Sequence, residues 1–275
     1  MKFAFCTCVQ IGLSCMEAIY EANGTLDLII SLPDDKAVKK SGRIYVDEFA
    51  GRKDIPVIKS DHINNQAVIR ALREREIDWL YIIGWSQIAS NDVLNATNKG
   101  VVGAHPTLLP QGRGRAAIPW AIIKGLDKTG VTFFKMDEGV DTGLILGQEI
   151  IPINENETAT NLYKKVNIAH ESLIKRIHPK LEKNEIIGEK QDESKATYWP
   201  GRKPEDGVLL PVMTVEEVDR LVRATTRPYP GAMLQFNEKK IIIWSGEIGK
   251  KNDSDMVFEF KDGFYTATDY DLIVE

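Results

Sequence analysis

The first half of the chain alternates short apolar runs with amphipathic segments. Four apolar runs have the length and composition of strands, at residues 3–9, 26–32, 79–83 and 100–104. Continuous apolar runs are typical of strands that are buried on both faces of a parallel sheet. Helical periodicity covers residues 11–22 and 91–96, and a further segment that Asn64 could cap. Strand and helix therefore alternate, which predicts an α/β fold with a Rossmann-like, doubly wound and mainly parallel sheet.

The second half contains one long helix and then a change of composition. Apolar side chains recur at three- or four-residue steps through residues 158–181, which predicts an amphipathic helix. Residues 191–204 are polar and punctuated by proline, so we expect a catalytic domain over 1–190, this linker, and a small β-rich domain over 205–275. The small domain is expected to hold one helix (215–224) and short strands such as 240–244 and 257–261.

Candidate chemistry is concentrated between residues 100 and 153. His105 ends an apolar strand and begins a proline-bounded loop, where a role in the core is less expected. Asp141 lies between two β-like runs, in the loop sequence MDEGVDTG. An aspartate that faces a histidine orients the ring and stabilises its cationic form, the arrangement needed for proton transfer near neutral pH. We therefore take His105 and Asp141 as a candidate catalytic pair.

Charge and composition exclude several classes of protein. The 275 residues carry a formal net charge of −5 and no long basic run, which argues against binding of nucleic acid. No apolar run approaches the ~20 residues that span a bilayer, and the N-terminus fits a strand and helix better than a signal peptide. Cys6, Cys8 and Cys15 do not have zinc-binding spacing. We expect a cytoplasmic protein without a membrane segment.

Three further patterns are weaker. Residues 112–117 match G-x-G-x-x-A but follow a proline-bounded loop, so dinucleotide binding is not expected. The same turn could meet an anion through Arg113 and Arg115. The four histidines lack the spacing of a metal site, and no metal is expected. The lysine-rich segment 33–54 is either a loop over a site or a solvated connection.

Two ordered motifs resemble a known family. His105 opens the run HPTLLP, and Asp141 follows 36 positions later within DEGVDTG, residues 137–143. Together they resemble the 10-formyltetrahydrofolate-dependent formyltransferases, which act on glycinamide ribonucleotide, methionyl-tRNA or the amines of sugar nucleotides. The resemblance covers residues 1–190. The run RATTRPYPGA at 223–232 is similar to the small C-terminal domain of the methionyl-tRNA and sugar-amine branches.

The resemblance implies a formyl donor, 10-formyltetrahydrofolate, and an amine that attacks its formyl carbon. His105 would move protons at the tetrahedral centre, and Asp141 would hold His105 and assist proton removal. The folate would lie against two loops, with the binding residues Gly84, Trp85, Ser86, Gln87, Ile88, Asp137 and Gly139.

One position departs from the family. The usual motif is Asn-x-His, in which the asparagine supplies an amide to the oxyanion, and here that position is Gly103. Losing one such donor typically costs ~2.7–4 kcal/mol of transition-state stabilisation. Another donor, such as Gln87, a loop amide or water, could replace it; otherwise the enzyme is slow or inactive.

The acceptor that the resemblance favours is a nucleotide-linked amino sugar, carried by dTDP or CMP (pseudaminic-acid type included) and used for surface glycans. Arg113 and Arg115 would then hold its anionic groups. Residues 200–275 contain ten basic and fourteen acidic residues, which disfavours a methionyl-tRNA formyltransferase. An impaired protein that binds folate or sugar nucleotide without turnover also fits the motifs, and a formyltetrahydrofolate hydrolase fits them less well. The expected partners are the small-molecule acceptor and a second copy of the chain in a homodimer.

Overall fold

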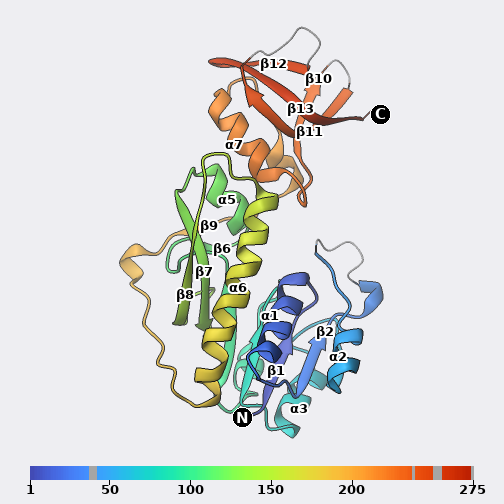
Figure 1. Ribbon diagram of the computed structural model, residues 1–275, viewed down its shortest axis with the longest axis vertical. Helices are drawn as coiled ribbons and strands as arrows, with labels where there is room; N and C mark the ends of the chain where they lie inside the picture. Colours follow the sequence, from blue (N-terminus) through green and yellow to red (C-terminus); the bar gives the residue numbers. More distant parts are fainter. Residues whose placement is uncertain (37–41, 237–238, 250–255, 274–275) are drawn as a thin grey trace. The chain divides into compact units, whose positions relative to one another are not determined.

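The computed structural model describes residues 1–36, 42–236, 239–249 and 256–273 (Figure 1). The chain divides into two compact units. Unit 1 comprises Met1–Arg113, Gly130–Ile150 and Val166–Tyr198, and unit 2 comprises Gly114–Thr129, Ile151–Lys165 and Trp199–Glu275. Most of the segment that the sequence suggests as a linker, residues 191–198, therefore packs within unit 1.

A seven-stranded sheet forms the centre of unit 1, in the order β3-β2-β1-β4-β5-β7-β8. Its strands are β1 (Phe3–Cys6), β2 (Leu28–Ser31), β3 (Val57–Lys59), β4 (Trp79–Ile82), β5 (Gly100–His105), β7 (Lys128–Lys135) and β8 (Leu144–Pro152). β1 pairs in parallel with β2 and β4, and the chain winds outwards from β1 in both directions. This order confirms the doubly wound, mainly parallel sheet. In such sheets ligands bind beyond the carboxyl ends of the strands.

Helices cover both faces of this sheet because alternate strand residues point to opposite sides. They are α1 (Gln10–Glu21), α3 (Gln66–Glu74), α4 (Asn91–Leu94) and α6 (Ala159–Glu182), with the short α2 (Asp47–Lys53) near β2. Ala4 and Cys6 share one buried cluster with Val68 of α3 and Val93 of α4. On the other face Phe3 contacts His178 of α6, with ring centroids 4.4 Å apart.

β7 departs from the parallel pattern. It pairs antiparallel with β5, and this register places His105 opposite Thr132 and Gly103 opposite Phe134. This pairing brings Thr132 and Phe134 of β7 next to the end of β5 that carries His105. This register is tertiary information that the apolar pattern alone does not contain.

Unit 2 holds a four-stranded antiparallel sheet with one helix packed against it. The elements are β10 (Ala232–Phe236), β11 (Lys239–Ile248), β12 (Met256–Phe260), β13 (Gly263–Ile273), α5 (Ala117–Ile123) and α7 (Val215–Thr225). Thr214 and Glu217 form a capping box that begins α7. Val218 and Val222 of α7 share a buried cluster with Ile243 and Tyr265 of the sheet. This arrangement confirms the expected β-rich C-terminal domain.

Local details differ from the sequence expectations. Asn65 caps α3, since its side chain accepts a hydrogen bond from Ala67 N at 3.1 Å, whereas Asn64 accepts one from Ser90 N. In the segment 33–54, Lys39 and Lys40 lie outside the described residues. Arg43 is described, and its guanidinium donates to the carbonyl oxygens of Cys8 and Leu32. No helix in the described part of the chain is both long and apolar enough to cross a membrane.

Candidate active site

His105 ends β5, and its ring lies between two hydrogen-bond acceptors. Nε2 is 2.7 Å from the carbonyl oxygen of Gly112, and Nδ1 is 3.5 Å from a carboxylate oxygen of Asp141. The residue is buried, with 7% of its surface exposed. A doubly protonated ring can donate to both neighbours, whereas a neutral ring can donate to only one. The structure therefore brings together the two residues that the sequence suggests as a proton-transfer pair.

The loop that carries Asp141 is held by its own side chains. Asp137 Oδ1 accepts hydrogen bonds from Gly139 N at 3.0 Å and Thr142 Oγ1 at 2.6 Å. Asp141 has φ +57°, a left-handed conformation that costs free energy for a residue other than glycine. A Cβ atom at Gly143 would overlap the Lys135 carbonyl oxygen, so only glycine fits this turn. Asp137, expected among the folate-binding residues, thus also maintains the shape of the loop.

The second expected folate loop follows β4. Trp85 is half-buried and packs against the core, whereas Gly84 and Ser86 are exposed and Ile88 is 73% exposed. Asn91, in the helix that follows this loop, donates to Glu138 at 2.9 Å. This bond ties the segment after β4 to the Asp141 loop, so the two stretches expected to bind folate lie beside each other.

The side-chain amide of Gln87 forms hydrogen bonds within the protein. Its Oε1 accepts from Ile63 N at 2.9 Å and from Trp85 Nε1 at 3.1 Å, and its Nε2 donates to Asp61 O at 2.7 Å. The Asp61 carbonyl engages one of the two N–H groups of Nε2. Gln87 therefore stays a candidate replacement for the missing asparagine amide, together with a loop amide or water.

At Gly103 the space that a side chain would need is filled. A Cβ atom built there would lie 2.9 Å from Phe134 Cζ and 3.1 Å from Met136 Cγ. Phe134 belongs to β7 and is only 3% exposed. The family's asparagine is therefore replaced by a glycine together with an aromatic ring packed over it.

Arg113 has a different place from the one expected. Its side chain is fully buried, and all five of its N–H donors are used by Gln191, Glu193 and Tyr198. No donor is left for an acceptor's phosphate, so the structure does not support a contact between Arg113 and the acceptor. The sequence pattern could not distinguish this arginine from Arg115, which is exposed and belongs to unit 2.

Two of the other histidines, His170 and His178, are buried. Burial lowers the pKa of His170 to about 4, with the nearby His105 lowering it further and a hydrogen bond to the Val166 carbonyl opposing. Burial likewise lowers the pKa of His178 to about 4, and its Nδ1 lies 2.9 Å from the hydroxyl of Tyr81. Across the described ranges, no group of three His, Cys, Asp or Glu residues could hold a metal ion.

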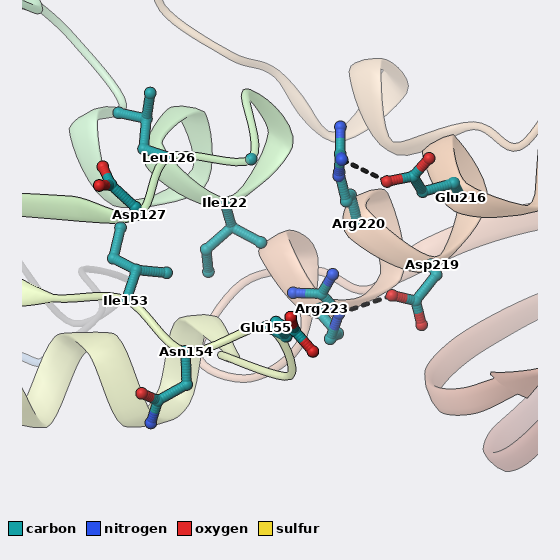
Figure 2. A pocket seen from close by; sticks show the side chains of 11 residues that line it. Ile122, Leu126, Asp127, Ile153, Asn154, Glu155, Glu216, Asp219, Arg220 and Arg223 are labelled. Atoms are coloured by element: carbon teal, nitrogen blue, oxygen red, sulfur yellow. Dashed lines mark hydrogen bonds and ion pairs between the residues drawn. The ribbon is translucent and has the colours of Figure 1, made fainter.

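Unit 2 contains a separate pocket of about 470 Å³, shown in Figure 2. It is lined by the end of α5, the chain before α6, and α7. Its two arginines are paired within α7, Arg220 with Glu216 and Arg223 with Asp219 at 2.7 Å. Because these cations are already neutralised and the lining has two further carboxylates, the pocket does not suit a phosphate.

The fold thus places a histidine and an aspartate beside each other, beyond a central strand of a doubly wound α/β sheet. The family comparison gives the class of reaction. Residues 18–177 match the family described as formyl transferase, and residues 203–273 match the formyl transferase C-terminal domain. The first match spans more than half of the chain, so the protein belongs to the formyl transferase family.

Several solved structures share the fold over nearly the whole chain. An N-formyltransferase from Helicobacter canadensis, in complex with folinic acid and dTDP-3-aminofucose, has a TM-score of 0.71 and 20% identity over 97% of this chain and 98% of its own. WlaRD, a sugar 3N-formyl transferase with dTDP and 5-N-formyl-THF, has a TM-score of 0.70 and 21% identity over 97% of each chain. Methionyl-tRNA formyltransferase from Clostridium thermocellum has a TM-score of 0.65 and 18% identity over 100% of each.

Proposed function

We propose that this enzyme transfers the formyl group of 10-formyltetrahydrofolate to the amine of a nucleotide-linked amino sugar. The observation that carries the proposal is the His105–Asp141 pair, 3.5 Å apart beyond β5, within a formyl transferase fold. Two of the structural relatives are described with a dTDP-sugar or dTDP together with a formylated folate, which supports this donor and this class of acceptor.

The chemistry needs a base and then an acid. The neutral amine attacks the formyl carbon, the carbonyl oxygen becomes an oxyanion, and the amine must lose a proton. When the tetrahedral intermediate collapses, the bond to folate N10 breaks and N10 takes up a proton. Asp141 would orient the His105 ring and stabilise its positive charge while the ring moves these protons. A cationic ring would also stabilise the oxyanion, which is of particular value where Gly103 replaces the asparagine.

The loops beside the pair suit a flat, partly apolar donor. Ile88 is 73% exposed, Val140 on the Asp141 loop is 51% exposed, and Leu144 at the start of β8 is 42% exposed. Exposed apolar side chains next to polar backbone are typical of a surface that binds an aromatic ligand. We infer that the folate rings lie against these residues and Trp85, while Arg115 remains a candidate for the acceptor's phosphates.

The test is incubation of the purified protein with 10-formyltetrahydrofolate and one of three acceptors: a dTDP-linked amino sugar, a CMP-linked amino sugar or methionyl-tRNA. Mass spectrometry of the products should show a gain of one formyl group on a sugar nucleotide, and Asp141→Asn should abolish most of it. Formylation of methionyl-tRNA alone would refute the proposed acceptor. Formate released without any acceptor would indicate a hydrolase, and folate binding without any product would indicate an impaired enzyme.

A further inference from the structure

Gln191 has a fully satisfied amide beneath the Asp141 loop. Its Nε2 donates to the carbonyl oxygens of Asp141 and Gly143, each at 2.8 Å. Its Oε1 accepts two bonds from Arg113, from Nη2 at 2.8 Å and from Nε at 3.2 Å. The side chain is 4% exposed, and an arginine can only donate, so the orientation of the amide is determined by its partners.

Arg113 is in turn held from the other side. Glu193 accepts from both terminal nitrogens, at 2.6 and 2.8 Å, and the Tyr198 hydroxyl accepts at 2.9 Å. The bidentate bond to Glu193 is the main reason that the pKa of the guanidinium is raised. A planar cation with all five donors occupied cannot rotate without breaking several bonds, so it provides Gln191 with a rigid support.

The same stretch of chain also holds the other side of the catalytic pair. Thr197 Oγ1 accepts from Gly112 N at 2.8 Å, and Arg113 N donates to the Thr197 carbonyl at 2.9 Å. These bonds place the Gly112 carbonyl that receives His105 Nε2 at 2.7 Å. Residues 191–197 therefore contact both the backbone that carries Asp141 and the backbone that fixes the His105 ring.

We propose that Gln191, supported by Arg113, is a positioning residue for formyl transfer. It acts through the Asp141 and Gly143 carbonyls, which keep Asp141 in its left-handed conformation with the carboxylate at His105. The test of this proposal by enzyme kinetics rests on the proposed function, whereas the test by nuclear magnetic resonance does not. The residue lies in a stretch that reads as a polar linker in the sequence, and no motif marks it.

Gln191→Glu is the sharpest variant. The carboxylate keeps the shape of the side chain and its bonds from Arg113, but it replaces both N–H donors with an oxygen that repels the two carbonyls. A shift of the reacting geometry by roughly 1 Å can cost ~10²-fold in rate, so kcat should fall by about 10- to 100-fold. KM for the folate and for a dTDP-linked amino sugar should change by less than about threefold, because the residue does not contact substrate. Gln191→Met, which removes all four bonds, should give at least the same loss.

Tyr81→Phe is the matched control. It removes the buried hydrogen bond between Tyr81 on β4 and His178 on α6. The hydrogen bonds and ion pairs found for His105 in the described residues go to Gly112 and Asp141, not to Tyr81 or His178. It should lower the melting temperature and leave kcat unchanged. A kcat loss in Gln191→Glu no greater than in Tyr81→Phe, or a loss that appears only in KM, would overturn the proposal.

A second readout needs no turnover. The ¹⁵N chemical shifts of the His105 ring nitrogens report which of them carries a proton, and His105→Gln identifies the signal. These shifts should change in Gln191→Glu and stay as in the wild type in Tyr81→Phe. If the wild type formylates no acceptor, the proposed function fails, while the ring signals still test the positioning role. Unchanged His105 signals in Gln191→Glu would refute the positioning role, whether or not turnover can be measured.

Discussion

Gly103→Asn, which restores the family's amide, should destabilise the protein and fail to raise its activity. The new Cβ would lie 2.9 Å from Phe134 Cζ and 3.1 Å from Met136 Cγ, and the rest of the side chain has to find room as well. Phe134 is buried in β7, opposite Gly103, so its ring cannot turn out to solvent. The perturbation is therefore overpacking of a close-packed strand pair.

The magnitude follows from three contributions. Overpacking typically costs about 1–3 kcal/mol. A buried amide without a partner costs about 1–3 kcal/mol more, and replacing glycine returns about 0.5–1 kcal/mol through the unfolded chain. The net loss in the free energy of unfolding is then about 1–5.5 kcal/mol. At roughly 2–4 °C per kcal/mol for a protein of this size, the melting temperature should fall by at least about 2 °C.

Urea denaturation of a double-mutant cycle with Phe134→Leu provides the assay. The smaller side chain opens the space, so the double variant should lose less stability than the sum of the two single variants, with a coupling of about 1–2 kcal/mol. If Gly103→Asn melts within about 1 °C of the wild type, or if the two losses add, the steric argument is wrong. Faster formyl transfer by Gly103→Asn alone would show that the ring does not block the amide.

Three further predictions concern charge. Burial lowers the pKa of His170 and His178 to about 4 in the folded protein, whereas in the unfolded chain both pKa values are near 6.5. As the pH falls from 6.5 towards 4, the unfolded chain therefore binds protons that the folded protein does not, and the free energy of unfolding decreases. Each histidine should cost about 2 kcal/mol between pH 7.5 and pH 5, and His178→Gln should flatten the urea midpoint against pH over this range. Asp141→Asn should lower kcat by about 10²–10⁴ while calorimetry finds folate affinity nearly unchanged, and a loss confined to affinity would contradict its role. Arg113→Ala should lower the free energy of unfolding by at least about 2 kcal/mol, because it removes the N–H groups that donate to the Gln191 side-chain oxygen. Arg115→Ala should leave the free energy of unfolding unchanged and should raise KM for the acceptor if Arg115 binds the acceptor's phosphate.

Much of the site's outline was accessible from the chain alone. The apolar runs and helical periodicity predict the alternating strands and helices, because the spacing of apolar residues along the chain reflects which faces of a strand or helix are buried. The same reasoning predicts that His105 follows a strand and that Asp141 lies in a loop. The placement of the two side chains 3.5 Å apart agrees with that interpretation.

Other features depended on contacts between distant segments. Arg113 and Arg115 have the same local pattern, yet one is buried against residues 191–198 and the other is exposed. In the sequence, Gly103 indicates only that a hydrogen-bond donor is missing. The structure shows in addition that the pairing of β5 with β7 packs the Phe134 ring against Gly103.

Residue order by itself determined the α/β class and the β-rich character of the C-terminal domain, and it singled out His105 and Asp141 as a candidate pair. Periodicity and motif spacing carry this information. Only the tertiary structure decided that β7 runs antiparallel, that Phe134 fills the place of the family's amide, and that Gln191 lies beneath the Asp141 loop. The physical reason is that register and close packing join residues far apart in the chain. A side chain's neighbours, and hence its role, are not encoded in its immediate sequence.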